Sequence, residues 1–213
     1  VDSASAAGHR VLRNRFTYKR KPDRFKARLV VLGYEQGGHE ETFAPTCNIK
    51  TVRMLLARYC HSKFAVHLVD ICNAFCNSDM PADRPVIIRP PEGREHLPEY
   101  RDKVLRLRRG LYGLRQSPRL WSQTFAKYMC NQSFTPLRND TCVYYRRGPT
   151  PGRGLWVCVF VDDCLIIGDP DECRRFKKQL ATDFKIRDYA EVDSFLGIEI
   201  TRTGISTHFS QRQ

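Results

Sequence analysis

The segment LWVCVFVDDCLIIG, residues Leu155 to Gly168, constrains the fold more than any other part of the chain. Seven mostly apolar residues precede Asp162 and Asp163, and four more apolar residues lead to Gly168. An Asp pair suits a tight turn, and flanks that are apolar at every position indicate two strands buried on both faces. Adjacent carboxylates at the tip of a buried hairpin repel each other and need cations or hydrogen-bond donors. The pair is therefore either a cation site or a solvated turn that uses Asp for its backbone geometry.

A second carboxylate-terminated strand favours the cation site. The segment FAVHLVD runs from Phe64 to Asp70 and is mainly apolar until its last residue. If this strand lies beside the Asp162–Asp163 hairpin, three carboxylates meet at one end of the sheet. Hard divalent cations such as Mg²⁺ take oxygen ligands and keep phosphate oxygens in their coordination shell. Two such ions can clamp the attacking and leaving oxygens of a phosphoryl transfer.

The remaining pattern predicts a mixed α+β fold with an antiparallel sheet backed by helices. Ser117 is a plausible helix N-cap and Pro118 suits the first helical position. We expect helices over residues 49–59, 117–129 and 170–184, and strands over residues 25–34, 64–70, 86–89, 104–108, 142–145, 155–161, 164–167 and 195–201.

Charge points to a polyanionic partner. The 213 residues include 36 Lys and Arg against 23 Asp and Glu, a net charge of +13. Such a surplus favours nucleic acids through counterion release, although a basic surface can also serve solubility alone. With 41% hydrophobic residues the chain is not a disordered one. It also lacks the run of about 20 apolar residues that spans a bilayer, so we expect no membrane association.

The nine cysteines argue against a zinc site and against a disulfide framework. Their number is odd, no two form a C-x2-C pair, and several lie inside apolar runs. Free Cys in such runs behaves as a small buried hydrophobe. A reducing intracellular compartment fits this usage best.

We expect two parts along the chain. Residues 1–24 are polar and basic and are predicted to form a flexible N-terminal segment, and residues 25–213 are predicted to form the folded domain. The N-terminus has no apolar stretch of a signal peptide. The absence of an initial Met indicates a fragment of a longer protein.

Seven motifs, taken together, resemble the reverse transcriptase domain of copia-type LTR retrotransposons. They follow one another in the order and at the spacing of that family, over about residues 24–210. In this sequence they read KARLVVLGYEQ at 26–36, ETFAP at 41–45, HLVDICNAFCN at 67–77, RPPEG at 89–93, LYGLRQSPRLW at 111–121, FVDDCLIIG at 160–168 and FLGIEI at 195–200.

The resemblance implies a right-hand polymerase with palm and fingers, mostly without a thumb. Asp70 matches the first catalytic Asp of the family, and Asp162 and Asp163 match its Asp pair. The same three carboxylates and the backbone carbonyl of Ile71 would hold two Mg²⁺ ions, with Mn²⁺ as the alternative metal. The substrates implied are deoxynucleoside triphosphates and an RNA or DNA template with its primer.

The resemblance also assigns four nucleotide-binding residues: Lys26, Arg28, Phe75 and Gln116. Arg28 and Lys26 match positions that hold the triphosphate, and an Arg fork suits phosphate. Phe75 matches the aromatic residue that excludes a 2′-hydroxyl, and Gln116 matches a contact to nucleotide and template. Without the resemblance, Lys26 and Arg28 would be interpreted as residues on a solvated strand face. Phe75 would be interpreted as a core residue, and Gln116 as the residue that precedes a helix cap.

A primer grip is implied at Phe195, Leu196 and Gly197, where Gly197 would allow the backbone to approach the primer closely. From the residues alone, this segment reads as an ordinary edge strand. The family also implies cytoplasmic retrotransposon particles, with later passage to the nucleus, and a dimer or a longer polyprotein as a further partner.

Two other functions stay open. Phe160 stands where the family usually has Tyr, and Leu32 stands beside Gly33 where a Lys is common. A degenerate or truncated remnant that binds nucleic acid without polymerising would tolerate both changes. A structural subunit that pairs with a longer catalytic chain would also do so.

Overall fold

The computed structural model describes residues 1–2, 8–38, 41–59, 64–150, 153–189, 192–203 and 206–211. The chain forms two units. The first contains Val1–Ala44 and Phe75–Thr124, and the second contains Pro45–Ala74 and Phe125–Gln213. No helix in the described ranges is long and apolar enough to span a membrane.

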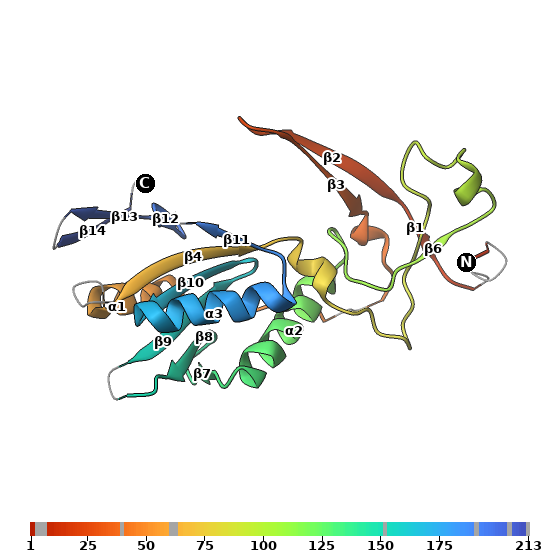
Figure 1. The fold of residues 1–213 in the computed structure, drawn as a ribbon. Helices are drawn as coiled ribbons and strands as arrows, with labels where there is room; N and C mark the ends of the chain where they lie inside the picture. The colour runs from red at the N-terminus through yellow and green to blue at the C-terminus, as the bar shows by residue number, and fades with distance from the viewer. Residues whose placement is uncertain are drawn as a thin grey trace. The chain divides into compact units, whose positions relative to one another are not determined.

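The second unit is built on a six-stranded antiparallel sheet (Figure 1). Strands β7 to β10 are neighbours in the sheet in the same order as in the sequence. Strand β4, which comes earlier in the chain, lies between β10 and β11. In sheet order the strands are β11 (Ile186–Tyr189), β4 (Ala65–Ile71), β10 (Asp163–Gly168), β9 (Gly154–Phe160), β8 (Asp140–Arg147) and β7 (Thr135–Leu137).

Both faces of this sheet are covered, as the apolar hairpin flanks predict. Helix α1 (Ile49–Tyr59) and helix α3 (Pro170–Asp183) both contact β10, and every residue of β10 after Asp163 is buried. The α1 side forms a large apolar cluster. Its buried members include Val52, Leu55 and Leu56 of α1 with Leu165 and Ile167 of β10. Helix α2 (Ser117–Asn131) begins in the first unit and ends in the second.

Helix α3 begins at a well-formed cap. The Asp169 side chain accepts hydrogen bonds from the backbone N–H groups of Asp171, at 3.0 Å, and Glu172, at 3.4 Å. Pro170 occupies the first helical position, where its missing N–H is not needed. The acidic Asp171 and Glu172 also complement the positive end of the helix dipole.

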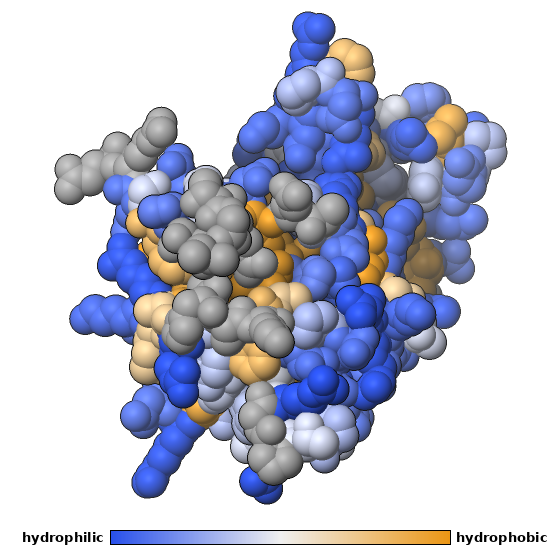
Figure 2. Space-filling view, turned by 60° about the vertical axis from the view of Figure 1, so that its left-hand side comes forward, coloured by the Kyte–Doolittle hydropathy of each residue, from blue (hydrophilic) through white to orange (hydrophobic). Residues whose placement is uncertain are grey.

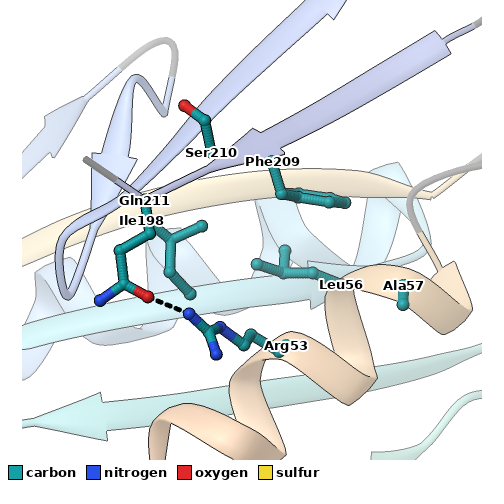
Figure 3. A pocket seen from close by; sticks show the side chains of 7 residues that line it. All are labelled: Arg53, Leu56, Ala57, Ile198, Phe209, Ser210 and Gln211. Atoms are coloured by element: carbon teal, nitrogen blue, oxygen red, sulfur yellow. Dashed lines mark hydrogen bonds between the residues drawn. The ribbon is translucent and has the colours of Figure 1, made fainter. Parts of the chain in front are cut away.

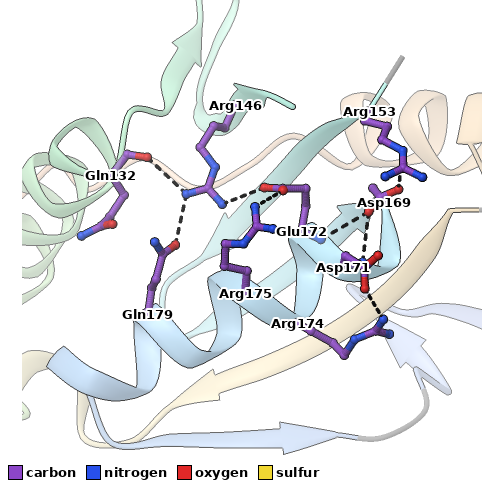
Figure 4. A network of polar contacts seen from close by, with 9 residues as sticks. All are labelled: Gln132, Arg146, Arg153, Asp169, Asp171, Glu172, Arg174, Arg175 and Gln179. Atoms are coloured by element: carbon purple, nitrogen blue, oxygen red, sulfur yellow. Dashed lines mark hydrogen bonds and ion pairs between the residues drawn. The ribbon is translucent and has the colours of Figure 1, made fainter. Parts of the chain in front are cut away.

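A half-buried arginine ties α3 to β8 (Figure 4). The Arg146 guanidinium lies 3.5 Å from the Glu172 carboxylate and donates to the Gln179 side chain at 3.2 Å. Its carbon centre is 4.6 Å from the Phe134 ring centroid and 5.6 Å from that of Phe176. Burial lowers the pKa of Arg146, with the Glu172 charge opposing that shift. A charge buried in this way needs all of these partners.

The C-terminal strand differs from the prediction. We expected one strand over residues 195–201. The structure instead has β12 (Ser194–Phe195), a turn at Leu196 and Gly197, and β13 (Ile198–Thr203), which pairs with β14 (Ser206–Ser210). The prediction of one unbroken strand was wrong because Leu196 and Gly197 both take positive φ angles, 52° and 74°, which reverse the chain.

The first unit has two small sheets. Strands β2 (Asn14–Arg20) and β3 (Phe25–Val31) form an antiparallel hairpin. Strand β1 (Val11–Leu12) pairs in parallel with β5 (Ile87–Ile88), which pairs with β6 (Leu105–Arg106). The described residues also form the short 3-10 helices η2 (Gly33–Glu35), η3 (Ala74–Asn77) and η4 (Pro98–Tyr100), of which η3 begins at the last residue of the second unit's Pro45–Ala74 segment. A modest apolar cluster of this unit is centred on Leu12, Val31, Val86, Ile88 and Leu114.

The predicted α+β class with an antiparallel sheet and backing helices is confirmed. Regular structure begins earlier than expected, because β1 and β2 lie within residues 1–24. The boundary between a flexible segment and a domain at residue 24 stays a prediction. Ser117 is the first residue of α2 and not the residue before the helix, as was expected. Its hydroxyl donates to the Leu111 carbonyl at 2.8 Å and accepts from the Leu111 N–H at 3.0 Å.

The surface reflects the charged composition. Figure 2 shows a face that is hydrophilic over most of its area, with hydrophobic residues gathered near the middle. Large apolar side chains that are exposed in the first unit include Tyr18, Phe25, Tyr34 and Phe43.

Candidate active site

The strand register brings Asp70 and Asp163 together. In the antiparallel pair of β4 and β10, Asp163 lies directly opposite Asp70. Directly opposed residues of such a pair project from the same face, with their Cβ atoms about 5 Å apart. Asp162 lies in the turn between β9 and β10, and its backbone carbonyl accepts a hydrogen bond from the Ile71 N–H at 2.8 Å. The structure thus gathers the four predicted metal-binding positions at one end of the second unit's sheet.

The turn that carries Asp162 has strained backbone geometry. Phe160 pairs with Asp163, so the turn has only two central residues, Val161 and Asp162. Val161 has a φ of 58°, a region that a β-branched residue rarely adopts. Strain of this kind costs about 1–3 kcal/mol and persists where the surroundings impose it. Here the two flanking strands and the Ile71–Asp162 hydrogen bond impose it, and they fix the position of Asp162 relative to Asp163.

The three carboxylates interact electrostatically. Burial, together with the negative charges of Asp162 and Asp70, raises the pKa of Asp163 to about 6. Like charges held this close favour protonation or a bound cation. Among the described residues, no group of three or more His, Cys, Asp or Glu side chains is arranged as a ready metal cluster. The donor chemistry fits a hard divalent cation, since all three side chains are oxygen donors.

Two further residues contact Asp70. Arg187 lies opposite Asp70 in the pair of β11 and β4, and its guanidinium is 4.0 Å from the Asp70 Oδ2. The Cys72 thiol donates a weak hydrogen bond to the same oxygen, with Sγ at 3.9 Å. The sequence pattern did not indicate Arg187, because β11 is short and its alternation is weak. Arg187 therefore places a positive charge beside Asp70, to which the hairpin otherwise brings the negative charges of Asp162 and Asp163.

The predicted primer grip forms the tip of the β12–β13 hairpin. Leu196 and Gly197 are its two central residues, and positive φ at both is the pattern of a type I′ turn. Phe195 is buried in the apolar cluster on the α1 side of the sheet, and Leu196 packs against it. A Cβ on Gly197 would meet nothing within 4 Å. Within this chain, Gly197 is therefore required for its backbone angle.

Arg28 and Phe75 lie in the first unit, and a tyrosine connects them. The Arg28 guanidinium carbon lies 5.4 Å from the Tyr112 ring centroid, within the range of a cation–π contact. The Phe75 ring centroid lies 4.9 Å from that of Tyr112, with the ring planes at 60°. The Tyr112 carbonyl also accepts from the Val31 N–H at 2.8 Å, which holds the tyrosine against β3.

Gln116 is buried and hydrogen-bonded. Its Oε1 accepts from the Gln36 side chain at 2.8 Å, while the Gln36 Oε1 accepts from the Arg115 N–H at 2.9 Å. Gln36 and Gln116 both line a cavity of about 310 Å³ in the first unit, together with His9, Arg10 and Arg84 among others. Lys26 lies on β3 opposite Lys19 of β2 and is half-buried.

A second cavity lies between α1 and the β13–β14 hairpin (Figure 3). Its volume is about 300 Å³, and Leu56, Ala57, Ile198 and Phe209 make most of its wall apolar. Arg53 donates to the Gln211 side chain across it. Among the described residues that line it, none is an acid, a histidine or a cysteine, so these residues offer no group for acid–base or metal chemistry.

Comparison with known proteins identifies the family. The sequence profile described as reverse transcriptase (RNA-dependent DNA polymerase) matches residues 3–213. The chain belongs to the reverse transcriptase family. The predicted resemblance to this family is therefore confirmed.

The relatives of this reverse transcriptase domain include plant transposon polyproteins. It is 31% identical over 92% of its length to the retrovirus-related Pol polyprotein from transposon TNT 1-94 of Nicotiana tabacum. It is 33% identical over 93% of its length to that from transposon RE1 of Arabidopsis thaliana. These matches cover only 15% and 14% of the two relatives, so the domain spans about one seventh of their length.

Solved structures are less similar. Telomerase from Candida albicans, in complex with a fragment of telomeric RNA, matches with a TM-score of 0.45 and 10% identity, covering 98% of this chain and 48% of the telomerase chain. Similarity at this level carries no argument about the activity of the domain.

Within the reverse transcriptase domain, sequence reasoning missed Tyr112 and Gln36. Both lie in motifs that carry the family resemblance, LYGLRQSPRLW and KARLVVLGYEQ. The available signal was that each residue directly precedes a glycine, Tyr112 before Gly113 and Gln36 before Gly37. It was not decisive because the contacts with Phe75 and Gln116 join segments distant in sequence.

The raised pKa of Asp163 predicts a pH-dependent stability in the metal-free protein. Because the folded-state pKa is about 6 and the ordinary value is 3.8, the protonated carboxyl is favoured in the fold. The protonated Asp163 carboxyl stabilises the folded protein fully below pH 3.8, and this stabilisation is lost as the pH rises through 6. Asp163→Asn, which mimics the protonated form, is expected to be more stable than the wild type by about 1 kcal/mol at pH 7.5, after discounting for partial exposure.

Denaturant unfolding in EDTA at pH 4 and pH 7.5 measures this difference. At pH 4 the two proteins should unfold at closely similar midpoints. An equal advantage of Asp163→Asn at both pH values would show that the carboxylate charge is not its cause.

Proposed function

We propose that this domain is an RNA-directed DNA polymerase that extends a primer with deoxynucleoside triphosphates, and that it also copies DNA templates. One observation carries the proposal within this family. The antiparallel register pairs Asp70 with Asp163, and the adjacent two-residue turn holds Asp162. Carboxylates in this arrangement suit phosphoryl transfer, in which the protein mainly positions groups and supplies charge.

Divalent metal ions are the cofactor that we propose for this site, two Mg²⁺ or two Mn²⁺. The residues that would hold them are Asp70, Asp162, Asp163 and the backbone carbonyl of Ile71. The donor set supports this, because burial and like-charge repulsion together raise the Asp163 pKa, and a bound cation would offset both. When bound, such ions neutralise phosphate charge and lower the pKa of a primer hydroxyl.

The protein's own residues would then orient the substrates. In this proposal, Arg28 binds the triphosphate through its planar fork of donors. Phe75 excludes a 2′-hydroxyl by its bulk, and Gln116 contacts the nucleotide or template through its amide. The Leu196–Gly197 turn would hold the primer backbone.

The test is incorporation of a labelled deoxynucleotide on a primed RNA template, with Mg²⁺ or with EDTA. Template-dependent extension that requires the metal supports the proposal. If the folded domain binds template-primer without extending it under any metal condition, the remnant function replaces this one. Repeating the assay on a primed DNA template tests the DNA-directed activity separately.

Tyr112 should control how nucleotides are selected. Tyr112→Ala removes the ring that Arg28 and Phe75 both contact. We expect the KM for deoxynucleotides to rise by roughly 10-fold, since a cation–π contact contributes about 1 kcal/mol or more. Discrimination against ribonucleotides should fall as well, because Phe75 loses its support.

Single-nucleotide incorporation kinetics with matched deoxy and ribo substrates measure both effects. Tyr112→Phe keeps the ring and is the control, so it should behave like the wild type. If Tyr112→Ala kept wild-type discrimination between the two sugars, Tyr112 would not position Phe75.

A further inference from the structure

The β2–β3 hairpin of the first unit has two chemically different faces. Its register pairs Phe16 with Leu29, Tyr18 with Ala27, and Arg20 with Phe25. Since directly opposed residues share a face, one face carries three aromatic rings. We call Phe16, Tyr18, Arg20 and Phe25 the aromatic face. The opposite face carries Arg15, Lys19, Lys26 and Arg28.

Two of the three rings of the aromatic face are open to solvent, and Phe16 is half-buried. Tyr18 is 78% exposed and Phe25 is 82% exposed. Phe16 and Tyr18 stack with their centroids 6.0 Å apart and their planes at 28°. The Arg20 guanidinium lies over the Phe25 ring, 5.9 Å from its centroid. Neighbouring rings and a stacked guanidinium therefore make a row of flat surfaces along one side of the hairpin.

The charge around this row selects its partner. Between Asn14 and Val31 the sequence contains seven Lys and Arg residues and a single acidic residue, Asp23. A second copy of the same hairpin would meet like charge. A polyanion would meet complementary charge, and nucleic acids release counterions when cations neutralise their phosphates.

We propose that the aromatic face is a stacking site for the unpaired bases of a single-stranded nucleic acid, with the hairpin's cations binding its phosphates. Bases within a duplex present only their edges, whereas unpaired bases offer π-faces to aromatic rings and to arginine planes. The site is separate from the Arg28–Tyr112–Phe75 stack, because Arg28 projects from the opposite face of the hairpin. The inference rests on the proposed function only in taking nucleic acid as the substrate class.

Fluorescence anisotropy with labelled oligonucleotides tests the site without requiring polymerisation. The double variant Tyr18→Leu/Phe25→Leu keeps apolar side chains at two exposed positions, so it should fold like the wild type. We expect its affinity for a single-stranded oligonucleotide to fall by roughly 10-fold or more. Its affinity for an abasic oligomer of equal length, which has phosphates and no bases, should not change.

Two control variants separate stacking from charge and from general exposure. Lys19→Gln should weaken binding to base-containing and abasic strands alike, and reduce the salt dependence by about one phosphate contact. Tyr34→Leu removes a 69% exposed aromatic ring outside the hairpin and should change neither affinity.

Three results would overturn the proposal. The first is an equal loss of affinity for base-containing and abasic strands in the double variant, and the second is no loss at all. The third is a wild-type dimer that the double variant abolishes, which would make the face an interface between copies. A wild type that binds single strands through their bases but extends no primer would refute the polymerase and leave the stacking site standing.

Discussion

Asp162→Asn is expected to reduce metal-dependent nucleotide incorporation on a primed RNA template by on the order of 10³-fold or more. The substitution keeps the size of the side chain and removes its negative charge. Loss of roughly 4 kcal/mol of transition-state stabilisation corresponds to that factor. The backbone should not change, because the Ile71 N–H bonds to the Asp162 main-chain carbonyl and not to its side chain.

The matched control for this variant is Asp171→Asn. Asp171 lies in the first turn of α3 with its side chain 64% exposed. Its loss should leave incorporation within about twofold of the wild type and change stability by about 0.5 kcal/mol or less. Circular dichroism and thermal unfolding would verify that Asp162→Asn is folded. A folded Asp162→Asn protein with wild-type incorporation would exclude Asp162 from the metal site.

The central hairpin could be predicted from sequence because its residues all indicate the same structure, two strands buried on both faces. Burial on both faces requires apolar residues at every position of β9 and β10, and the sequence has them up to the two Asp residues. The neighbour of β10 could not be derived in the same way. Nothing in FAVHLVD specifies which strand it pairs with, so the contact between Asp70 and Asp163 depended on an assumption that the register confirms.

Strand β2 was missed because its environment differs from that of the sheet core. Five of its seven residues are exposed, so the run of Arg, Thr and Lys shows no apolar side to a pattern search. Cross-strand pairing with β3 defines it instead. The aromatic face was missed for the same reason. In the sequence, Tyr18 and Phe25 look like isolated aromatic residues, and only the strand register shows that they lie on one face.

The turn at Leu196 shows a different limit. A Leu with φ of 52° contradicts its own local preference, and only Gly197 beside it signals a reversal. Packing of Phe195, Ile198 and Ile200 into the cluster with α1 decides the conformation. Tertiary burial therefore overrides the local β propensity of FLGIEI.

Gly113→Ala is expected to destabilise the first unit by about 3 kcal/mol. Gly113 has a φ of 90°, and a Cβ there would lie 2.0 Å from the Val31 carbonyl oxygen. The backbone angle costs a substituted residue about 1–2 kcal/mol, and the steric overlap adds a similar amount. The bond from the Val31 N–H to the Tyr112 carbonyl lies at the same contact and would be displaced.

Denaturant unfolding against Gly37→Ala measures this effect. A Cβ on Gly37 would meet nothing within 4 Å, and its φ is not positive, so that variant should stay within about 0.5 kcal/mol of the wild type. A Gly113→Ala protein as stable as Gly37→Ala would mean that the segment carrying Tyr112 does not pack against β3 as described.

Gly33 tests the same contact from its other side. A Cβ on Gly33 would lie 2.0 Å from the Gly113 carbonyl oxygen, so Gly33→Ala should destabilise the protein by a similar amount. Both substitutions force apart the same pair of segments, and once these have separated the second Cβ meets less resistance. The double variant should therefore cost less than the sum of the two single ones, by about 1 kcal/mol or more. Strict additivity would indicate two independent contacts and would remove the reason for linking Tyr112 to the position of Arg28.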